Sequence, residues 1–368
     1  MEPVTKFRSD ARITWYRCKI DKQVLASLTR KSDWQGFRQV ICQLGLFAAT
    51  ATLACLAWAN ITVANWYWSV PLLLGALFLH GTFAQFTGLV AIHELVHKTP
   101  FKTQFWNEFF LKLYSFISWS DYIWFRPSHG KHHQLTVHKD YDGEVVLPQK
   151  FSFKDWQFWL GLLAWNPVST WKLLKNYARW ATGSIDGDWY RFILPEANTE
   201  LRRKHRQWAR LVLLGHAALA AVFILSGHWF FIVVFTFGTQ YCGWLIFLCG
   251  SPQHFGLAPD VSDFRLCCRT YTCSWLPAFL YWNMQYHIEH HMFPAVPFYQ
   301  LPKLRAAIRD DLPPAPHGLL ATWKHLLAIH RRQIADPSYV YVPELPQCAA
   351  GGPQAADQIL LTEAVPAG

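Results

Sequence analysis

The chain has 368 residues, of which 52% are hydrophobic and only 16% charged, and its formal net charge is +10. So few charged residues cannot cover a water-soluble globule of this length, and the composition therefore favours a membrane-embedded protein. The 20 Trp, 14 Tyr and 27 Phe agree, because amphipathic rings settle at the level of the lipid headgroups. The basic residues are spread along the chain instead of forming one tract, which argues against a nucleic-acid partner.

Two long stretches contain no Asp, Glu, Lys or Arg: 39–93, which is 55 residues, and 211–259, which is 49. A helix needs about 20 apolar residues to cross about 30 Å of hydrocarbon, so each stretch is long enough for two crossings. Turn-forming residues at 59–65 and 226–228 mark the reversals. The sequence therefore predicts an all-α integral membrane protein with four transmembrane helices in two hairpins, near 40–58, 67–90, 208–225 and 229–250.

Basic residues indicate how these hairpins are oriented. Of the 34 Lys and Arg, 9 precede the first hairpin, 17 lie between the hairpins, 8 follow the second, and the two reversal loops carry none. Because positive residues stay on the cytoplasmic side, we expect a multi-pass protein with both termini and the segment between the hairpins in the cytoplasm.

The rest of the chain divides by composition. Residues 1–38 are polar and basic and are expected to form a cytoplasmic arm, ahead of a membrane domain at 39–310. Within that domain, the segment 98–206 mixes Trp and Phe with Lys, which is typical of helices lying in the interface and predicts a cytoplasmic helical cap. A C-terminal amphipathic helix is expected within 311–342, followed by a disordered tail at 343–368.

Eight of the 17 histidines fall into three short groups with helical spacing. Residues three and four apart share one face of a helix, so we expect each group to direct its imidazoles to one point. Imidazole is a ligand for zinc, copper, iron and nickel, so the pattern predicts a metal site without choosing the metal. The groups are His93 and His97, then His129, His132 and His133, then His287, His290 and His291.

Topology allows these groups to meet. An even number of crossings between the first and last groups returns the chain to the same side of the membrane. His254 follows the expected fourth span and is a candidate ninth ligand. His80 lies 13 residues before His93, about 19 Å along a helix, and is too deep in the membrane to join the same site.

The first group is also a His-Glu-x-x-His motif, which in many helices binds the zinc ion of a peptidase. A membrane zinc peptidase would use only His93, Glu94 and His97, and would leave the other groups without a role. A non-enzymatic metal carrier is a further alternative, but it would need ligands along the spans, where His80 and His216 stand almost alone. In a larger metal site, Glu94 would orient a neighbouring imidazole or would be plain helix polarity.

The order and spacing of the three groups resemble those of the membrane fatty-acid desaturase superfamily, which includes the alkane and related hydroxylases. The run Tyr286-His287-Ile288-Glu289-His290-His291-Met292-Phe293-Pro294 is similar to the third histidine box of acyl-lipid desaturases. Gln253-His254-Phe255-Gly256 is similar to the additional histidine motif of the hydroxylase branch. The resemblance covers about 40–310 and implies two non-haem irons bound by the eight box histidines and His254, on a four-span stem.

The resemblance further implies that O2 is a co-substrate and that an unactivated C–H bond of a fatty-acyl or similar lipid chain is attacked. We favour desaturation on the strength of the third box, with hydroxylation by the same kind of centre as the alternative. No haem, flavin, nicotinamide or iron–sulfur motif is found in the sequence, so a separate carrier of the ferredoxin or cytochrome b5 type is expected to deliver electrons.

Overall fold

The computed structural model describes residues 7–8, 11–145, 147, 149, 151, 153–346 and 359–361. Residues 347–358 and 362–368 of the expected disordered tail, and 1–6 and 9–10 of the N-terminal arm, lie outside this part. The described chain is helical except for one pair of three-residue strands, β1 (Ala11–Ile13) and β2 (Ile359–Leu361), which run antiparallel.

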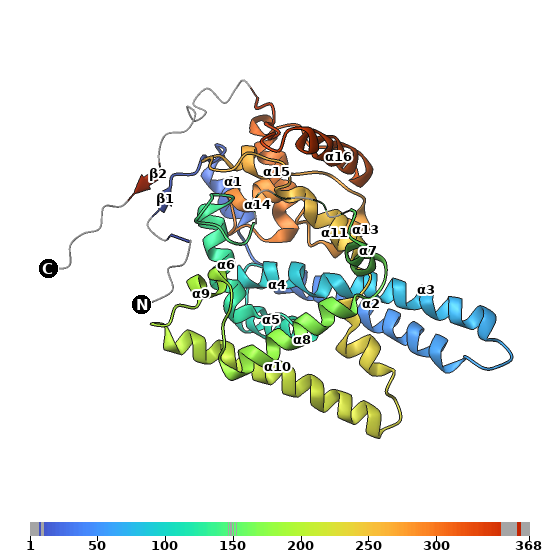
Figure 1. Cartoon of the computed structure of the whole chain (residues 1–368). Helices are drawn as coiled ribbons and strands as arrows, with labels where there is room; N and C mark the ends of the chain where they lie inside the picture. Colours follow the sequence, from blue (N-terminus) through green and yellow to red (C-terminus); the bar gives the residue numbers. More distant parts are fainter. Residues whose placement is uncertain are drawn as a thin grey trace.

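The first hairpin agrees with the charge-free stretch that predicts it. Helix α2 (Asp33–Ala59) begins at an N-cap in which the Ser32 hydroxyl accepts a hydrogen bond from the Gln35 amide. Helix α3 (Trp66–Ala84) packs antiparallel beside α2, and the pair extends away from the other helices (Figure 1). A 3-10 turn, η1 (Gln85–Thr87), links α3 to α4 (Leu89–Val96), which bears His93 and ends at its C-cap residue His97.

Three helices within the described residues are long and apolar enough to cross a membrane: α2, the α3–α4 unit over Trp66–Val96, and α10 (Thr199–Leu225). Exposed apolar side chains cover their outer surfaces, Leu74 and Leu214 among them. Lipid can solvate such side chains, whereas water would not. The chain is therefore a helical protein with several candidate membrane spans.

The predicted fourth span is not one helix. Between 229 and 250 the chain forms a π-helical turn, η2 (Ile232–Thr236), a 3-10 turn, η3 (Gly238–Gln240), an extended residue and then α11 (Trp244–Gly250). Side chains from the first half of the chain explain the interruption: His80 Nε2 donates to the Val234 carbonyl at 2.8 Å, and Trp119 Nε1 donates to the Thr236 carbonyl at 2.7 Å. Those carbonyls would otherwise accept the next α-helical hydrogen bonds.

The remaining helices form the cap that holds the histidines. Between the hairpins lie α5 (Gln104–Ile117), α6 (Tyr122–Leu135), α7 (Trp156–Leu163), α8 (Pro167–Thr182) and α9 (Asp188–Ile193). After α11 come η4 (Ser251–Gln253), α12 (Phe264–Cys267), α13 (Trp275–Leu280), α14 (His287–Met292), η5 (Phe298–Gln300), α15 (Leu301–Ile308), η6 (Arg309–Asp311) and α16 (Leu319–Ala335). Helix α1 (Lys22–Leu28) precedes the first hairpin and packs on α15.

The principal core lies between the membrane helices and this cap. It contains fully buried side chains from both parts, such as Leu95 and Phe101 near α4, and Trp282 and Ile288 near α14. Figure 1 shows α4 and α6 next to α14 in the middle of the molecule. The core therefore brings together three helices that are far apart in the sequence, and each of them carries one histidine group.

Candidate metal centre

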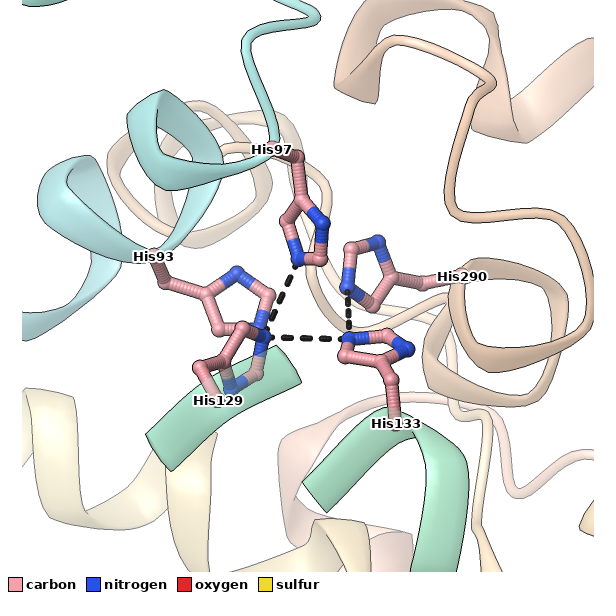
Figure 2. A group of neighbouring side chains, drawn as sticks. All are labelled: His93, His97, His129, His133 and His290. Carbon is pink, nitrogen blue, oxygen red and sulfur yellow. Dashed lines mark hydrogen bonds between the residues drawn. The ribbon is translucent and has the colours of Figure 1, made fainter. Parts of the chain in front are cut away.

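Five imidazoles meet at the junction of α4, α6 and α14. Their ring nitrogens lie within 4.8 Å of one another, and Figure 2 shows the rings turned toward a common point. His129 Nε2 is 3.0 Å from His97 Nε2 and 3.0 Å from His133 Nε2, and His290 Nε2 is 3.2 Å from His133 Nε2. We call His93, His97, His129, His133 and His290 the first group.

A second group of four buried imidazoles lies directly beside the first, with its nitrogens also within 4.8 Å of one another. His287 Nε2 is 3.0 Å from His254 Nε2 and 3.1 Å from His291 Nε2. The rings of His133 and His291 are only 4.3 Å apart, so the two groups are in contact. The second group consists of His132, His254, His287 and His291.

The expectation that each run of histidines in the sequence points to one centre is wrong for the run at 129–133 and for the run at 287–291. Helix α6 gives His129 and His133 to the first group but His132 to the second, and α14 gives His290 to the first group but His287 and His291 to the second. Helix geometry explains the division, because adjacent residues point about 100° apart whereas residues four apart are nearly in line. Each of these helices therefore serves both centres and fixes their separation.

These imidazoles fit metal ions. Two nitrogens bound at about 2.1 Å to one ion, at right angles, lie about 3.0 Å apart, which matches the observed Nε2 contacts. Burial lowers the pKa of His129, His133, His287, His290 and His291 well below the usual range, and that of His97 and His254 to about 3. Those rings are therefore neutral at pH 7, as ligands must be.

Hydrogen bonds at Nδ1 orient several of the rings, and this is most complete in the second group. His254 Nδ1 donates to the Cys267 carbonyl at 2.8 Å. Because the Thr136 hydroxyl donates to the His132 carbonyl at 2.6 Å, its oxygen is free to accept from His291 Nδ1 at 3.2 Å. A proton held at Nδ1 leaves the Nε2 lone pair for an ion, which is the usual arrangement around protein-bound metals.

A carboxylate takes this role at His132, whose Nδ1 is 2.8 Å from Asp142 Oδ2. Burial disfavours the His132 cation, but the charge and hydrogen bond of Asp142 outweigh burial and raise the His132 pKa to about 9. The Asp142 side chain is fully buried and also accepts the amides of Val137 and Glu144. Asp142 therefore both positions His132 and anchors the loop that follows α6.

The first group has acidic neighbours of its own. His129 Nδ1 is 2.9 Å from Glu144 Oε1, and burial raises the Glu144 pKa to about 7. Glu94 Oε1 is 3.1 Å from His93 Nδ1 and 3.8 Å from His290 Nδ1. Glu94 thus contacts rings from two different helices, as expected of an acid that orients imidazoles. It is not a member of either group of candidate ligands.

Glu289, between two histidines of the third box, turns away from both groups. Its Oε1 accepts a hydrogen bond from Arg305 Nη1 at 2.6 Å, and its Oε2 accepts one from the Thr270 hydroxyl at 2.5 Å. The side chain is fully buried, so these bonds compensate a charge that would otherwise be costly in the core. Glu289 and Arg305 therefore fasten α14 to α15.

Other histidine and cysteine side chains lie outside the two groups. His80 contacts Thr50 and Val234 inside the membrane helices, and His138 hydrogen-bonds the Thr136 carbonyl. Cys267 and Cys268 are buried with their sulfur atoms 4.0 Å apart, and neither side chain belongs to the two groups.

Sequence reasoning missed the groups that orient the rings. Asp142 and Glu144 lie in an acidic run nine and eleven residues after His133, and this proximity to the histidines could have identified them as candidate partners of the rings. The Cys267 carbonyl is a backbone group, which every residue type has, so the sequence does not indicate that it binds His254. Thr136 acts through a hydroxyl whose direction depends on its own hydrogen bond to His132.

The fold and the site together define a class: a helical protein with several candidate membrane spans and two adjoining histidine clusters suited to a pair of metal ions. The family model described as fatty acid desaturase matches residues 72–323, which is more than half of the chain. The chain therefore belongs to the fatty acid desaturase family and is an enzyme of that family. No individual curated protein matches it.

Proposed function

We propose that the protein introduces a double bond into a fatty-acyl chain of a membrane lipid. The observation that carries this proposal is the presence of two adjoining clusters of buried and partly buried histidines within a member of the desaturase family. The reaction consumes one O2, two electrons and two protons for each –CH2–CH2– unit, and yields one –CH=CH– unit and two waters. Atoms and electrons balance without any other reactant.

The nine histidines are proposed to hold two irons, with one ion in the first group and one in the second. Bound there, the irons would supply the reductive activation of O2. The chain's own residues perform the positioning: Asp142, Thr136 and the Cys267 carbonyl fix the rings of the second group, while Glu94 and Glu144 approach rings of the first. Burial of all four histidines of the second group excludes water from that part of the site.

An apolar cavity in the membrane part of the molecule agrees with an aliphatic substrate. The cavity has a volume of 610 Å³, within the range of about 300–1,000 Å³ usual for ligand pockets, and lies between α3, the end of α7 with the two residues after it, and the interrupted segment 233–242. Its walls are almost wholly apolar, with Leu77, Phe78 and Phe237 among them. A cavity of this size and chemistry suits part of an aliphatic chain.

Topology and electron supply complete the proposal. We place both termini and the nine histidines of the two groups on the cytoplasmic side, as the distribution of basic residues predicts, with 229–250 returning the chain across the membrane in its interrupted form. Electrons are proposed to come from a separate carrier of the ferredoxin or cytochrome b5 type.

Hydroxylation is the alternative outcome, and one observation favours it. His254 belongs to the second group, and its Gln-His-Phe-Gly context is similar to the additional motif of the hydroxylase branch. A membrane zinc peptidase is disfavoured by the geometry, because His93 and His97 share their centre with three further histidines from α6 and α14.

One experiment tests the proposal and separates its branches. The purified protein is assayed for iron and zinc per chain, and lipids are compared between cells that express the protein and cells that express a His132→Ala variant. We expect two irons and a new unsaturated lipid that depends on O2 and is missing from the variant. A new hydroxylated lipid would select the alternative. A single zinc, or unchanged lipids with two irons bound, would refute the oxidation of a lipid chain.

A further inference from the structure

A line of three aromatic rings connects the surface of the cap to the second group. Trp15 stacks on Phe264 with ring centroids 4.0 Å apart and planes within 9°, and the Phe264 ring is 5.4 Å from that of His291. Phe264 is buried, whereas Trp15 is half-buried and donates its indole N–H to the Gln134 carbonyl at 2.8 Å. No other residue separates these rings, and the first of them reaches solvent.

The segment that carries Trp15 is fixed to the cap. The Tyr16 amide donates to the Ser262 carbonyl at 2.9 Å, and the Tyr16 hydroxyl donates to Asp311 at 2.5 Å. The Arg265 guanidinium lies over the Tyr16 ring at 3.9 Å. These contacts hold Trp15 against Phe264.

Uncompensated positive charge surrounds Trp15 along the chain. Arg12, Arg17, Lys19 and Lys22 are exposed, and within the described part of the chain none of them forms an ion pair. Asp21, the acid among them, caps α1 by accepting the amides of Gln23 and Val24.

Three carboxylates near this segment pair with cations of the cap, and because two of them share one arginine, the three offset at most one of the positive charges on 12–22. Asp260 pairs with Lys139 at 3.5 Å, and Asp263 and Asp311 both pair with Arg265, at 2.7 and 2.6 Å. The free positive charge therefore lies on 12–22, on both sides of Trp15. A protein surface of this sign attracts an acidic partner and accelerates its encounter, more so at low salt.

We propose that an acidic one-electron carrier protein docks on residues 12–22 and that its electrons enter through Trp15 and Phe264 to the second histidine group. Each docking would oxidise the carrier by one electron, and with irons bound in the two groups, two dockings would supply the two electrons of one turnover. The inference rests on the proposed function, because only a reaction that consumes electrons requires such an entry point.

The docking surface is tested with the iron-loaded full chain in detergent and an acidic plant-type [2Fe–2S] ferredoxin as the probe. The triple variant R17E/K19E/K22E is compared with the control K172E/K175E/R331E, which reverses three exposed charges elsewhere on α8 and α16. We expect the first variant to bind ferredoxin at least tenfold more weakly at low ionic strength, and the control to bind as the wild type does. Equal losses in both variants, or no loss in either, would overturn the docking surface.

The ring relay is tested with Trp15→Leu and Trp15→Phe under anaerobic conditions. At saturating reduced ferredoxin, we expect Leu to slow ferredoxin oxidation at least tenfold and Phe to restore most of the rate, with iron content unchanged in both. Photoreduced deazaflavin, which is small and needs no docking, should reduce the iron equally fast in all three proteins. Ferredoxin oxidation at the wild-type rate in Trp15→Leu would overturn the relay.

These outcomes are separable from the fate of the proposed function. If ferredoxin delivers electrons through Trp15 but no lipid is desaturated or hydroxylated, the lipid reaction fails and the entry route stands. If lipid is oxidised equally well by the wild type and by Trp15→Leu with ferredoxin as donor, the entry route fails and the lipid reaction stands.

Discussion

The two histidine groups differ in how firmly they are held. All four residues of the second group are buried, whereas His93, His97 and His133 of the first are only partly buried. In the second group, three of the four Nδ1 atoms have hydrogen-bond partners fixed by the surrounding fold. In the first group, the acidic partners are Glu94 and Glu144, and the buried Nδ1 atoms of His133 and His290 have no hydrogen-bond partner in the described structure.

This difference suggests a division of labour within the proposed centre. Rings that are already oriented lose less freedom when they bind a metal, so the second group is the more preorganised site. Because three of its rings are partly exposed, the first group is the side from which small molecules would reach the proposed centre. The proposed electron entry, in contrast, reaches the second group, where Phe264 contacts His291.

Removing one ligand from each group should have the largest effect. We expect His290→Ala and His287→Ala each to lower lipid oxidation at least about 100-fold, because loss of a ligand should exceed the 10–100-fold effect of losing a ligand's own partner. Metal analysis should show each variant losing about one iron. His138→Ala removes a buried histidine outside both groups and should keep both irons. Full iron content in either ligand variant would contradict the assignment.

Substituting the carboxylates that orient the rings should have the next largest effect on iron binding, and the effect should differ between the two groups. Asp142 accepts three N–H donors, so an Asn side chain must turn its NH2 group toward one of them and leave that donor unpaired. Glu144 accepts from His129 Nδ1 and from the Ser128 hydroxyl, and a Gln amide can still donate to the Ser128 oxygen. We expect Asp142→Asn to weaken iron binding about 10–100-fold and Glu144→Gln to weaken it less.

Competition with a soluble chelator measures this difference. Each variant is titrated and the iron retained per chain is followed. The two substitutions each replace a carboxyl group by an amide, at positions two residues apart, so each is the control for the other. Equal weakening in both, or a larger loss in Glu144→Gln, would show that the second group does not depend more on its surroundings than the first.

The same titration of the wild-type protein should resolve two steps. We expect the first group to release its iron at a chelator concentration about tenfold lower than the second, because its rings are less buried and less oriented. Spectra of protein loaded with a single cobalt ion identify which group is filled, since His287→Ala and His290→Ala block different sites. Release of both irons in a single step would break the proposed distinction.

The sequence predicts much of this arrangement because its strongest signals are local. A run without charges is itself the cause of a membrane helix, and for this reason α2, the α3–α4 unit and α10 lie where three of the four spans are expected. The fourth span depends on distant side chains, because His80 and Trp119 donate hydrogen bonds to backbone carbonyls within 229–250 and so interrupt the helix. Hydropathy contains no information about such contacts.

The candidate centre shows the same limit. Helical spacing identifies eight of the nine histidines, and the position of His254 after the expected fourth span suggests the ninth, but neither signal can assign them to two groups without the positions of α4, α6 and α14 relative to one another. The orienting groups are harder still. Thr136, Val137 and Asp142 lie in a loop where Val137 has φ +59°, and a backbone of this kind has no clear sequence signal.

Two glycine substitutions should give the smallest effects. Gly256 has φ +69°, and an added Cβ would lie 2.4 Å from Cγ2 of the buried Ile329, so Gly256→Ala combines backbone strain of about 1–2 kcal/mol with a clash. Gly130 lies inside α6 beside His129 with open space around it, and Ala there should stabilise the helix by up to about 1 kcal/mol.

Thermal unfolding and iron retention distinguish the consequences for the two groups. Gly256 is two residues after His254, so Gly256→Ala should lower Tm by several degrees and loosen the second iron selectively. Gly130→Ala, on the helix that serves both groups, should leave Tm and both irons unchanged or slightly more stable. If Gly256→Ala loosened the first iron instead, the packing of α16 against the turn at 254–256 would not be what holds the second group in place.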